Sequence, residues 1–270
     1  MGARRPRRGT VLAPGYRILD HLHRSNHFDV FDAWDEGRWC RCILKTPRPD
    51  RIDDANTGRR LLREGRRLKR LRHPHIVSVV DVVAVPRPVV VMETLSGETV
   101  GRMVESSEGG IDDQSAAWMG IHLCSALSHL HSNGLVHLDL KPSNVVAESG
   151  RAVVIDLSSA TRPGRIRAGV GTWCYMAPEQ VRGGDVGTAA DVWGLGMVLH
   201  EALRGTHALP DDRRRRTDGW VPQPLTRERP DSPLAEVVDR CLRFDPADRP
   251  SLTALATGLA DVTGTPFPPR

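Results

Sequence analysis

The sequence has little of several features that would point to particular functions. Aromatic residues make up only 4% of its 270 residues, too few for the stacking platforms that bind single-stranded nucleic acids. No apolar run approaches the roughly 18 residues of a membrane span, and no apolar segment of a secretory signal follows the basic N-terminus. The net charge of +5 is modest. We therefore expect a globular cytoplasmic protein with no nucleic-acid partner and no membrane partner.

Cysteine is also sparse, and its spacing excludes two common uses. The five cysteines are scattered, and no pair has the CxxC spacing of zinc sites. An odd, dispersed set argues against a disulfide framework and favours a reducing compartment. Cys40-Arg41-Cys42 alternates as strand residues do, so these two cysteines predict one face of a strand rather than a metal site.

Lysine is the rarest charged residue. Only three of the 38 basic residues are lysine, namely Lys45, Lys69 and Lys141, and all the others are arginine. A chain that uses arginine wherever positive charge suffices is expected to keep lysine where a compact point charge on a flexible stem is needed. Lys45 and Lys141 are therefore candidate functional residues.

The pattern of apolar residues divides the chain in two. Strands dominate residues 16–92, with strands expected over 22–34, 39–44, 76–85 and 89–92 and a helix over 59–71. Beyond residue 94 the pattern is mainly helical, with helices expected over 112–131, 191–204, 233–244 and 252–259 and a small hairpin of strands at 145–146 and 152–155. Residues 205–230 predict a long loop with room for a short helix.

Three oxygen-bearing side chains stand around the predicted hairpin. Asp139 precedes it, Asn144 stands at its first strand, and Asp156 follows its second strand. Because a hairpin brings its ends together, we expect a patch of hard oxygen ligands that suits Mg²⁺ carried with a nucleotide better than zinc. Lys141, two residues after Asp139, would place a compact charge beside a phosphoryl group.

Glu64 gives an independent indication of a site. It falls on the stripe of Leu61, Leu68 and Leu71, the face that the helix over 59–71 should bury. A buried carboxylate needs a cationic partner, and Lys45 is the lysine of the preceding strand. We expect a Lys45–Glu64 pair; the alternative is that both residues are ordinary surface residues.

Several segments, taken in their order along the chain, resemble the catalytic domain of protein kinases. The resemblance is to the bacterial eukaryotic-like serine/threonine type. The resemblance runs from about residue 16 to about residue 259. Seven segments with family-like separations carry it. They are Ile43-Leu44-Lys45 for V-A-I-K, Glu64 for the helix glutamate, HPHIV at 73–77 for H-P-N-I-V, HLDLKPSN at 137–144 for H-R-D-x-K-P-x-N, Asp156 for D-F-G, MAPE at 176–179 for M-A-P-E, and DVW at 191–193 for D-x-W, with Arg249 for the arginine that pairs with Glu179.

The resemblance implies an α+β fold with two lobes. A small antiparallel-sheet N-lobe with one main helix would precede a larger, mainly helical C-lobe. The boundaries expected from the sequence are a basic tail over 1–13, the N-lobe over 14–94, the C-lobe over 95–259 and a Pro-rich tail over 260–270.

The resemblance also implies an ATP-dependent serine/threonine protein kinase that uses Mg²⁺, or Mn²⁺ in its place, and a protein substrate with a Ser or Thr acceptor. Asp139 would accept the proton of the substrate hydroxyl, and Lys141 would steady the γ-phosphoryl group. Asn144 and Asp156 would hold the metal ion. Lys45 would bind the α and β phosphates of ATP while paired with Glu64.

The resemblance also identifies residues that would bind adenine and residues that distinguish the serine/threonine branch of the family from the tyrosine branch. Met92 stands where the gatekeeper residue is expected, and Glu93 to Leu95 would form the hinge that offers backbone hydrogen bonds. Lys141 with Pro142, and Thr172 before MAPE, resemble the serine/threonine branch rather than the tyrosine branch.

The phosphate-covering loop departs from the family pattern G-x-G-x-x-G-x-V. With Val30 as the anchor, the three glycine positions become His23, Ser25 and Phe28. Glycine lets backbone N–H groups approach phosphates closely, and side chains hinder that approach. We expect weakened or altered ATP binding by His23, Ser25 and Val30.

Two further departures concern regulation. Leu138 replaces the arginine that receives an activating phosphate, and residues 162–170 contain no hydroxyl group. We therefore predict that phosphorylation of the segment 156–179 does not switch the protein on. Leu157-Ser158 replaces Phe-Gly, which narrows the backbone angles available to this motif.

Two alternatives to an active protein kinase remain open. A pseudokinase, used as a binding or scaffold module, is supported by the loop without glycine. A small-molecule phosphotransferase would share the two-lobed core, but Ala177-Pro178-Glu179 with Asp191 and Arg249 argues against it. The presence of every charged residue that the chemistry needs favours the active kinase.

Overall fold

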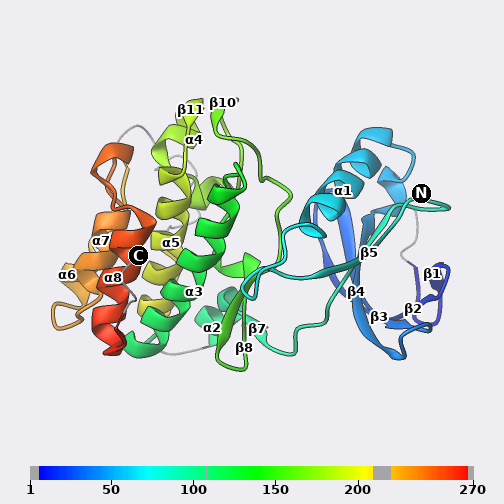
Figure 1. Ribbon diagram of the computed structural model, residues 1–270, viewed down its shortest axis with the longest axis horizontal. Helices are drawn as coiled ribbons and strands as arrows, with labels where there is room; N and C mark the ends of the chain where they lie inside the picture. The colour runs from blue at the N-terminus through cyan, green and yellow to red at the C-terminus, as the bar shows by residue number, and fades with distance from the viewer. Residues whose placement is uncertain (1–5, 107–108, 209–219, 267–270) are drawn as a thin grey trace. The chain divides into compact units, whose positions relative to one another are not determined.

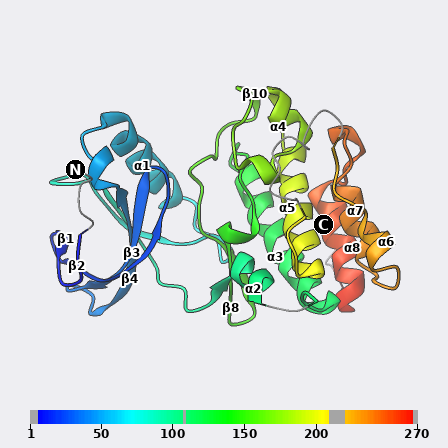
Figure 2. The same ribbon diagram turned by 180° about the vertical axis from the view of Figure 1, so that it is seen from behind.

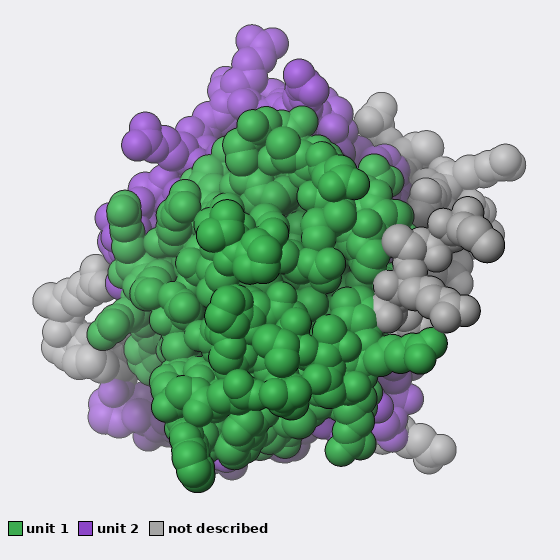
Figure 3. Space-filling model, turned by 90° about the vertical axis from the view of Figure 1, so that its right-hand side faces the viewer, with its two compact units in different colours: residues 1–96 green, residues 97–270 purple. Residues whose placement is uncertain are grey.

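Strands fill the first part of the chain, and helices fill most of the rest. The computed structural model describes residues 6–106, 109–208 and 220–266. The chain divides into two units, residues 1–96 and 97–270, which Figure 3 shows in two colours. Each unit contains its own strands and helices.

The first unit is built on a six-stranded antiparallel sheet with the strand order β1-β2-β3-β4-β6-β5 (Figure 1). The strands are β1 (Val11–Ala13), β2 (Tyr16–Arg24), β3 (Phe28–Asp35), β4 (Cys40–Pro47), β5 (Val79–Val83) and β6 (Val89–Met92). A 3-10 turn (Pro49–Arg51) and helix α1 (Ala55–Leu68) follow β4. The strand predicted at Cys40 and Cys42 is confirmed, and all five cysteines are free.

Two expectations for the first unit are wrong. The single strand expected over 22–34 is two strands, because the chain turns at residues 25–27. Ser25 Oγ accepts a hydrogen bond from the backbone N–H of Phe28 at 3.0 Å and so closes this turn. Residues 11–13, expected in a tail, form β1, because Leu12 and Ala13 are buried in the core of the sheet.

The register of the strands gives the sheet two different faces. Phe31 pairs with Leu44 and Leu44 pairs with Val91, and these three residues belong to the apolar core on one face. Val30, Lys45 and Val90 lie in the next register positions and therefore share the opposite face. Helix α1 covers that face at close range. A Cβ atom on Gly65 would lie 2.5 Å from Val90 Cγ2, so a glycine is required there.

The second unit is mainly helical, as both views of the ribbon show (Figures 1 and 2). Its helices are α2 (Val100–Ser106), α3 (Asp113–Ser132), α4 (Pro178–Arg182), α5 (Ala189–Arg204), α6 (Leu225–Glu228), α7 (Ala235–Cys241) and α8 (Leu252–Thr263). Strands β7 (Glu98–Thr99), β8 (Val145–Glu148) and β9 (Arg151–Val154) form one sheet, and β10 (Gly164–Ile166) pairs with β11 (Gly184–Val186). Helix α3 packs against α5 and α8.

Local signals mark the start of α3 and the end of α5. Asp112 caps α3 by accepting a hydrogen bond from Ser115 N at 2.8 Å, and α5 ends at Gly205, which has a φ of 70°. Helix α8 continues to Thr263, so it enters the tail that was expected from residue 260. The short helix in the loop over 205–230 is α6, and residues 209–219 of that loop lie outside the described residues.

No helix in the described ranges is long and apolar enough to cross a membrane.

Candidate active site

The loop of residues 137–139 is held in an unusual backbone conformation by a buried carboxylate. Leu138 has a φ of 63°, in the left-handed region that costs a residue with a side chain about 1–2 kcal/mol. Asp191 of α5, only 1% exposed, accepts hydrogen bonds from Leu138 N at 2.8 Å and from His137 N at 2.8 Å. His131 of α3 contacts the same carboxylate at 2.7 Å. The two central helices thus fix the position of the residue that follows, Asp139.

Three residues contact Asp139, namely Lys141, Asn144 and Thr172. Its Oδ1 accepts a hydrogen bond from Thr172 N at 2.7 Å, and Asn144 Nδ2 donates to its backbone oxygen at 2.9 Å. Lys141 Nζ donates to Thr172 Oγ1 at 2.6 Å and lies 3.6 Å from Asp139 Oδ2. The structure therefore brings together Asp139, Lys141 and Asn144, as expected. It adds Thr172, which the sequence linked only to the choice of acceptor.

The hairpin of β8 and β9 brings Asn144 and Asp156 together. Ile155 N donates to Asn144 O at 3.0 Å, and Val145 pairs with Val154. Asp156 follows directly, and its Oδ1 accepts a hydrogen bond from Ser158 N at 2.8 Å. The hairpin thus places these two residues as the sequence predicts.

The donor set around this hairpin fits Mg²⁺. Asn144 directs its amide nitrogen to Asp139 O, which leaves its amide oxygen as the atom that can bind a cation. A carboxylate and an amide oxygen are hard ligands, and Mg²⁺ keeps waters and substrate phosphates for its other positions. In the described part of the chain no three His, Cys, Asp or Glu side chains form a cluster that could hold a metal ion.

The expected pair of Lys45 and Glu64 is present in the first unit. Lys45 Nζ on β4 donates to Glu64 Oε1 on α1 at 2.9 Å, and the two residues are 7% and 6% exposed. Glu64 lies on the buried stripe of α1 with Leu61 and Leu68, so the helical spacing placed it correctly. A third residue joins the pair, because the Phe28 ring centroid lies 5.2 Å from Lys45 Nζ.

The hairpin that replaces the glycine-rich loop is held by polar side chains. Arg24 donates two hydrogen bonds to Asp29, at 2.6 and 2.7 Å, and His21 contacts the same carboxylate at 3.1 Å. Burial alone would raise the pKa of Asp29, but the hydrogen bonds from Arg24 and His21 outweigh it and keep the pKa below its ordinary value. His23 pairs with Val30 across this hairpin. Asp29 itself is fully buried.

The residues expected to contact adenine lie at the end of β6 and directly after it. Met92 is 6% exposed and pairs with Ile43 and Val79. Glu93 is tied to Ser78 twice, since its Oε1 accepts from Ser78 N at 2.8 Å and its backbone N donates to Ser78 O at 3.0 Å. Leu95 is half-buried in the segment that leaves the sheet.

Gln180 is an important residue that the sequence reasoning missed. It is 2% exposed, and its Nε2 donates to Leu138 O at 2.8 Å and to Val170 O at 2.9 Å, while its Oε1 accepts from Ala177 N at 3.0 Å. It therefore connects the 137–139 loop to the segment 162–172. A polar amide directly after MAPE was the signal that could have identified it.

The ion pair predicted between Glu179 and Arg249 is present. Arg249 donates to the two carboxylate oxygens at 2.7 and 2.9 Å. Its other hydrogen bonds go to the backbone oxygens of Arg243, Phe244 and Ala189.

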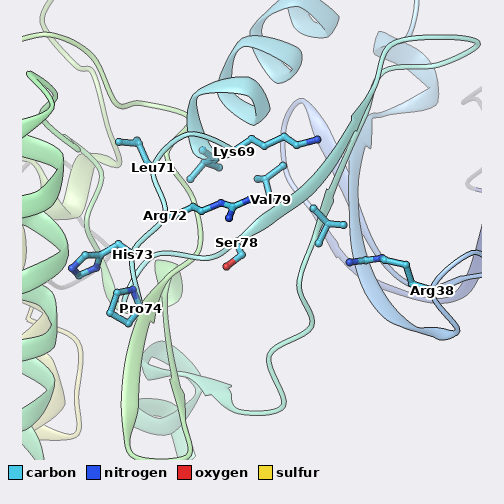
Figure 4. A pocket seen from close by; sticks show the side chains of 10 residues that line it. Arg38, Lys69, Leu71, Arg72, His73, Pro74, Ser78 and Val79 are labelled. Carbon is cyan, nitrogen blue, oxygen red and sulfur yellow. The ribbon is translucent and has the colours of Figure 1, made fainter.

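A separate cavity of about 630 Å³ lies in the first unit, outside the predicted site (Figure 4). Leu68, Leu71 and Val79 are among its apolar lining residues, and Lys69 and Arg72 add positive charge. Lys69, the third lysine of the chain, lies 3.5 Å from Asp81. The cavity contains none of the residues expected to act on a phosphoryl group.

Comparison with known proteins agrees with this geometry. The model of the protein kinase domain family matches residues 25–258. The chain is 33% identical over 243 residues to the serine/threonine-protein kinase PkaA of Streptomyces coelicolor, covering 80% of this chain and 42% of the relative. It is 35% identical over 206 residues to the serine/threonine-protein kinase PknB of Mycobacterium leprae, covering 72% and 33%.

A solved structure shows the same fold over the whole chain. The crystal structure of the PknI kinase domain of Mycobacterium tuberculosis, a double mutant, superposes with a TM-score of 0.77 at 26% identity and covers 97% of this chain and 100% of that chain. The chain belongs to the protein kinase domain family, and the expected two-lobed α+β fold is confirmed. It spans less than half the length of the curated relatives described above.

Proposed function

We propose that this chain is an ATP-dependent serine/threonine protein kinase that transfers the γ-phosphoryl group of ATP to a hydroxyl group of a protein. The main support is the arrangement of Asp139, Lys141, Asn144 and Thr172, which are joined by direct hydrogen bonds in the second unit. We also propose residues 14–94 and 95–259 as the two functional lobes.

Each residue has a defined part in the proposed reaction. The Asp139 carboxylate, oriented by Thr172 N, would hold the acceptor hydroxyl and take its proton. Lys141 would balance the negative charge that builds up on the transferred group. The family implies Mg²⁺, which Asn144 and Asp156 would hold, and its charge would stabilise the phosphates during transfer.

The acceptor preference rests on one contact. Lys141 Nζ donates to Thr172 Oγ1 at 2.6 Å, so the lysine is held beside the base and beside a segment that would contact the substrate. The same lysine and threonine mark the serine/threonine branch in the resemblance. Protein rather than a small molecule is favoured as the substrate, because the Glu179–Arg249 pair secures helix α4, which begins within MAPE.

The test is transfer of label from γ-labelled ATP with Mg²⁺ or Mn²⁺ to the chain itself and to a generic basic protein. Asp139→Asn keeps the shape of the side chain but removes the base, so transfer should fall about 10²- to 10⁴-fold. Asp156→Ala should also abolish transfer. Asp231→Asn changes an exposed aspartate and is the matched control, which should keep full activity.

Two outcomes would count against the kinase proposal. Transfer that persists in Asp139→Asn, with the melting temperature unchanged, would show that the label does not depend on the proposed base. A complete lack of transfer, with no rise in melting temperature on addition of Mg-ATP, would favour the pseudokinase alternative.

A further inference from the structure

Phe28 occupies a position where the family pattern has a glycine, and its ring lies against the candidate phosphate-binding lysine. Phe28 begins β3, two residues before Val30, so the two side chains share one face of the sheet. Val30 pairs with Lys45, which places the ammonium group on that same face. The Phe28 ring is 5% exposed, and its centroid lies 5.2 Å from Lys45 Nζ.

The contact is favourable in this environment. The face of a phenyl ring carries partial negative charge, and its attraction for an ammonium group grows as water is removed from both. Lys45 is 7% exposed, and both the ring and the carboxylate of Glu64 contribute to the negative surroundings that a buried cation needs. Phosphate oxygens would provide the same surroundings to the same Nζ atom.

We propose that the Phe28 ring is an internal competitor for the phosphates of the nucleotide at Lys45. This proposal rests on the function proposed above, because it assumes that Lys45 binds nucleotide phosphates. Binding of a di- or triphosphate then requires the ring to leave the ammonium group. The nucleotide affinity of this chain is consequently lowered by the strength of the contact between Phe28 and Lys45.

The neighbouring contacts indicate which part of the hairpin has to move. Asp29 points to the other face, where it is fully buried between Arg24 and His21. Arg48 N donates to His27 O at 3.0 Å, and Ser25 closes the turn. Because the backbone is tied on both sides of Phe28, rotation of the phenyl ring costs less than opening of the hairpin.

The test measures binding and does not depend on turnover. Phe28→Leu keeps an apolar side chain that can fill the site but has no aromatic ring, and Phe28→Ala removes the obstruction altogether. Asn26→Ala, at an exposed position of the same turn, is the matched control. Dissociation constants for Mg-ADP and for adenosine would be measured by calorimetry for all four proteins. Only Mg-ADP carries the phosphates that compete with the ring.

We expect both Phe28 variants to bind Mg-ADP about three- to tenfold more tightly than the natural chain, while the affinity for adenosine stays the same. That range corresponds to about 0.7–1.4 kcal/mol at roughly 1.4 kcal/mol per factor of ten, within the range of a desolvated cation–π contact. The Asn26→Ala variant should behave like the natural chain.

Several results would overturn the proposal. Unchanged or weaker binding of Mg-ADP by Phe28→Leu would show that the ring does not compete. An equal gain for adenosine would show that the variant loosens the hairpin generally. Labelled transfer by the natural chain with no effect of Phe28→Leu on Mg-ADP would refute this inference alone. A gain in Mg-ADP affinity without any transfer would support it and refute the kinase activity.

Discussion

Each unit contains an ion pair whose two partners are both buried, the Lys45–Glu64 pair in the first and the Glu179–Arg249 pair in the second, and these two pairs are built differently. In the second unit Arg249 makes five hydrogen bonds, two to Glu179 and three to backbone oxygens, and its guanidinium lies 5.1 Å from the ring of Trp193. In the first unit Lys45 Nζ donates to Glu64 at 2.9 Å and lies against the Phe28 ring. Both pairs are nearly inaccessible to solvent.

The difference fits a structural role for the Arg249–Glu179 pair and the proposed phosphate-binding role for Lys45. Five hydrogen bonds use all five donors of a guanidinium group, so Arg249 is fixed and has no donor left for a ligand. An ammonium group has three donors that rotate freely about a flexible stem, so Lys45 can turn from its protein partners to a phosphate. This explains why a chain so rich in arginine keeps lysine at position 45.

The largest expected effect comes from breaking the structural pair. Arg249→Ala would leave the Glu179 carboxylate buried without its cation and should lower the free energy of unfolding by about 3–5 kcal/mol. Arg249→Lys keeps the charge but cannot reach five acceptors. Its free energy of unfolding should therefore lie between that of the natural chain and that of Arg249→Ala. Urea denaturation of the three proteins measures this. An Arg249→Lys variant as stable as the natural chain would show that the planar fork is not needed.

Replacing Lys45 by arginine should affect phosphoryl transfer more than the free energy of unfolding. Lys45→Arg keeps the charge beside Glu64, so we expect the free energy of unfolding to change by less than about 1 kcal/mol. Phosphoryl transfer should fall about 10²-fold, because the fork cannot replace a mobile point charge on the phosphates. Steady-state kinetics beside urea denaturation separates the two effects. Full activity of Lys45→Arg would show that position 45 does not need the mobile point charge of a lysine.

A variant of Gln180 tests whether this side chain, rather than a phosphorylated residue, holds the segment over 162–172 in place. Gln180→Leu would leave Leu138 O and Val170 O without a donor, and we expect a loss of about 1–3 kcal/mol in stability. Transfer should slow about 10- to 100-fold because Asp139 loses its alignment. Gln114→Leu, an exposed glutamine of α3, is the matched control.

Phosphatase treatment completes the test of this segment. The natural chain should keep its activity after treatment, since Leu138 cannot receive a phosphate. An essential phosphosite within 156–179 would contradict this expectation.

The smallest effect is a dependence on pH in the first hairpin. The pKa of Asp29 is lowered in the folded chain, so its contribution is complete above its unfolded pKa of about 3.9 and is lost as the pH falls through the lower folded value. Asp29→Asn replaces charged hydrogen bonds with neutral ones and should cost about 1 kcal/mol at pH 7. Unfolding free energies from pH 7 to pH 2.5 should show this difference shrinking at acid pH. A difference that does not depend on pH would exclude the ion pair as its source.

Much of the site could be predicted because its residues lie close together in the sequence. HLDLKPSN contains Asp139, Lys141 and Asn144 within eight positions, and a two-strand hairpin then returns the chain to Asp156. Periodicity likewise located Glu64 on the buried face of its helix. The roles of these residues as catalytic and metal-binding groups remain predictions.

The parts that could not be predicted depend on contacts between distant residues or on local side-chain bonds. Gln180 contacts Leu138 across 42 positions, and no periodic pattern connects them. The strand over 22–34 is divided where Ser25 and Phe28 close a turn, through the Ser25 hydroxyl and a backbone hydrogen bond between the two residues. The sequence alone gave no reason to place the Phe28 ring on Lys45, because the face that a strand residue occupies depends on its register with the next strand.

The sequence by itself gave the order of the motifs, which depends on residue type and spacing along the chain. The family resemblance carried by these motifs implied the fold class, and the buried stripe of one helix favoured the Lys45–Glu64 pair. Only the tertiary structure decided which groups surround each lysine. The ring beside Lys45 and the threonine beside Lys141 come from other segments, and packing brings them to the ammonium groups. The free energy of a buried charge depends on the groups around it, and the sequence does not show which groups these are until the chain has folded.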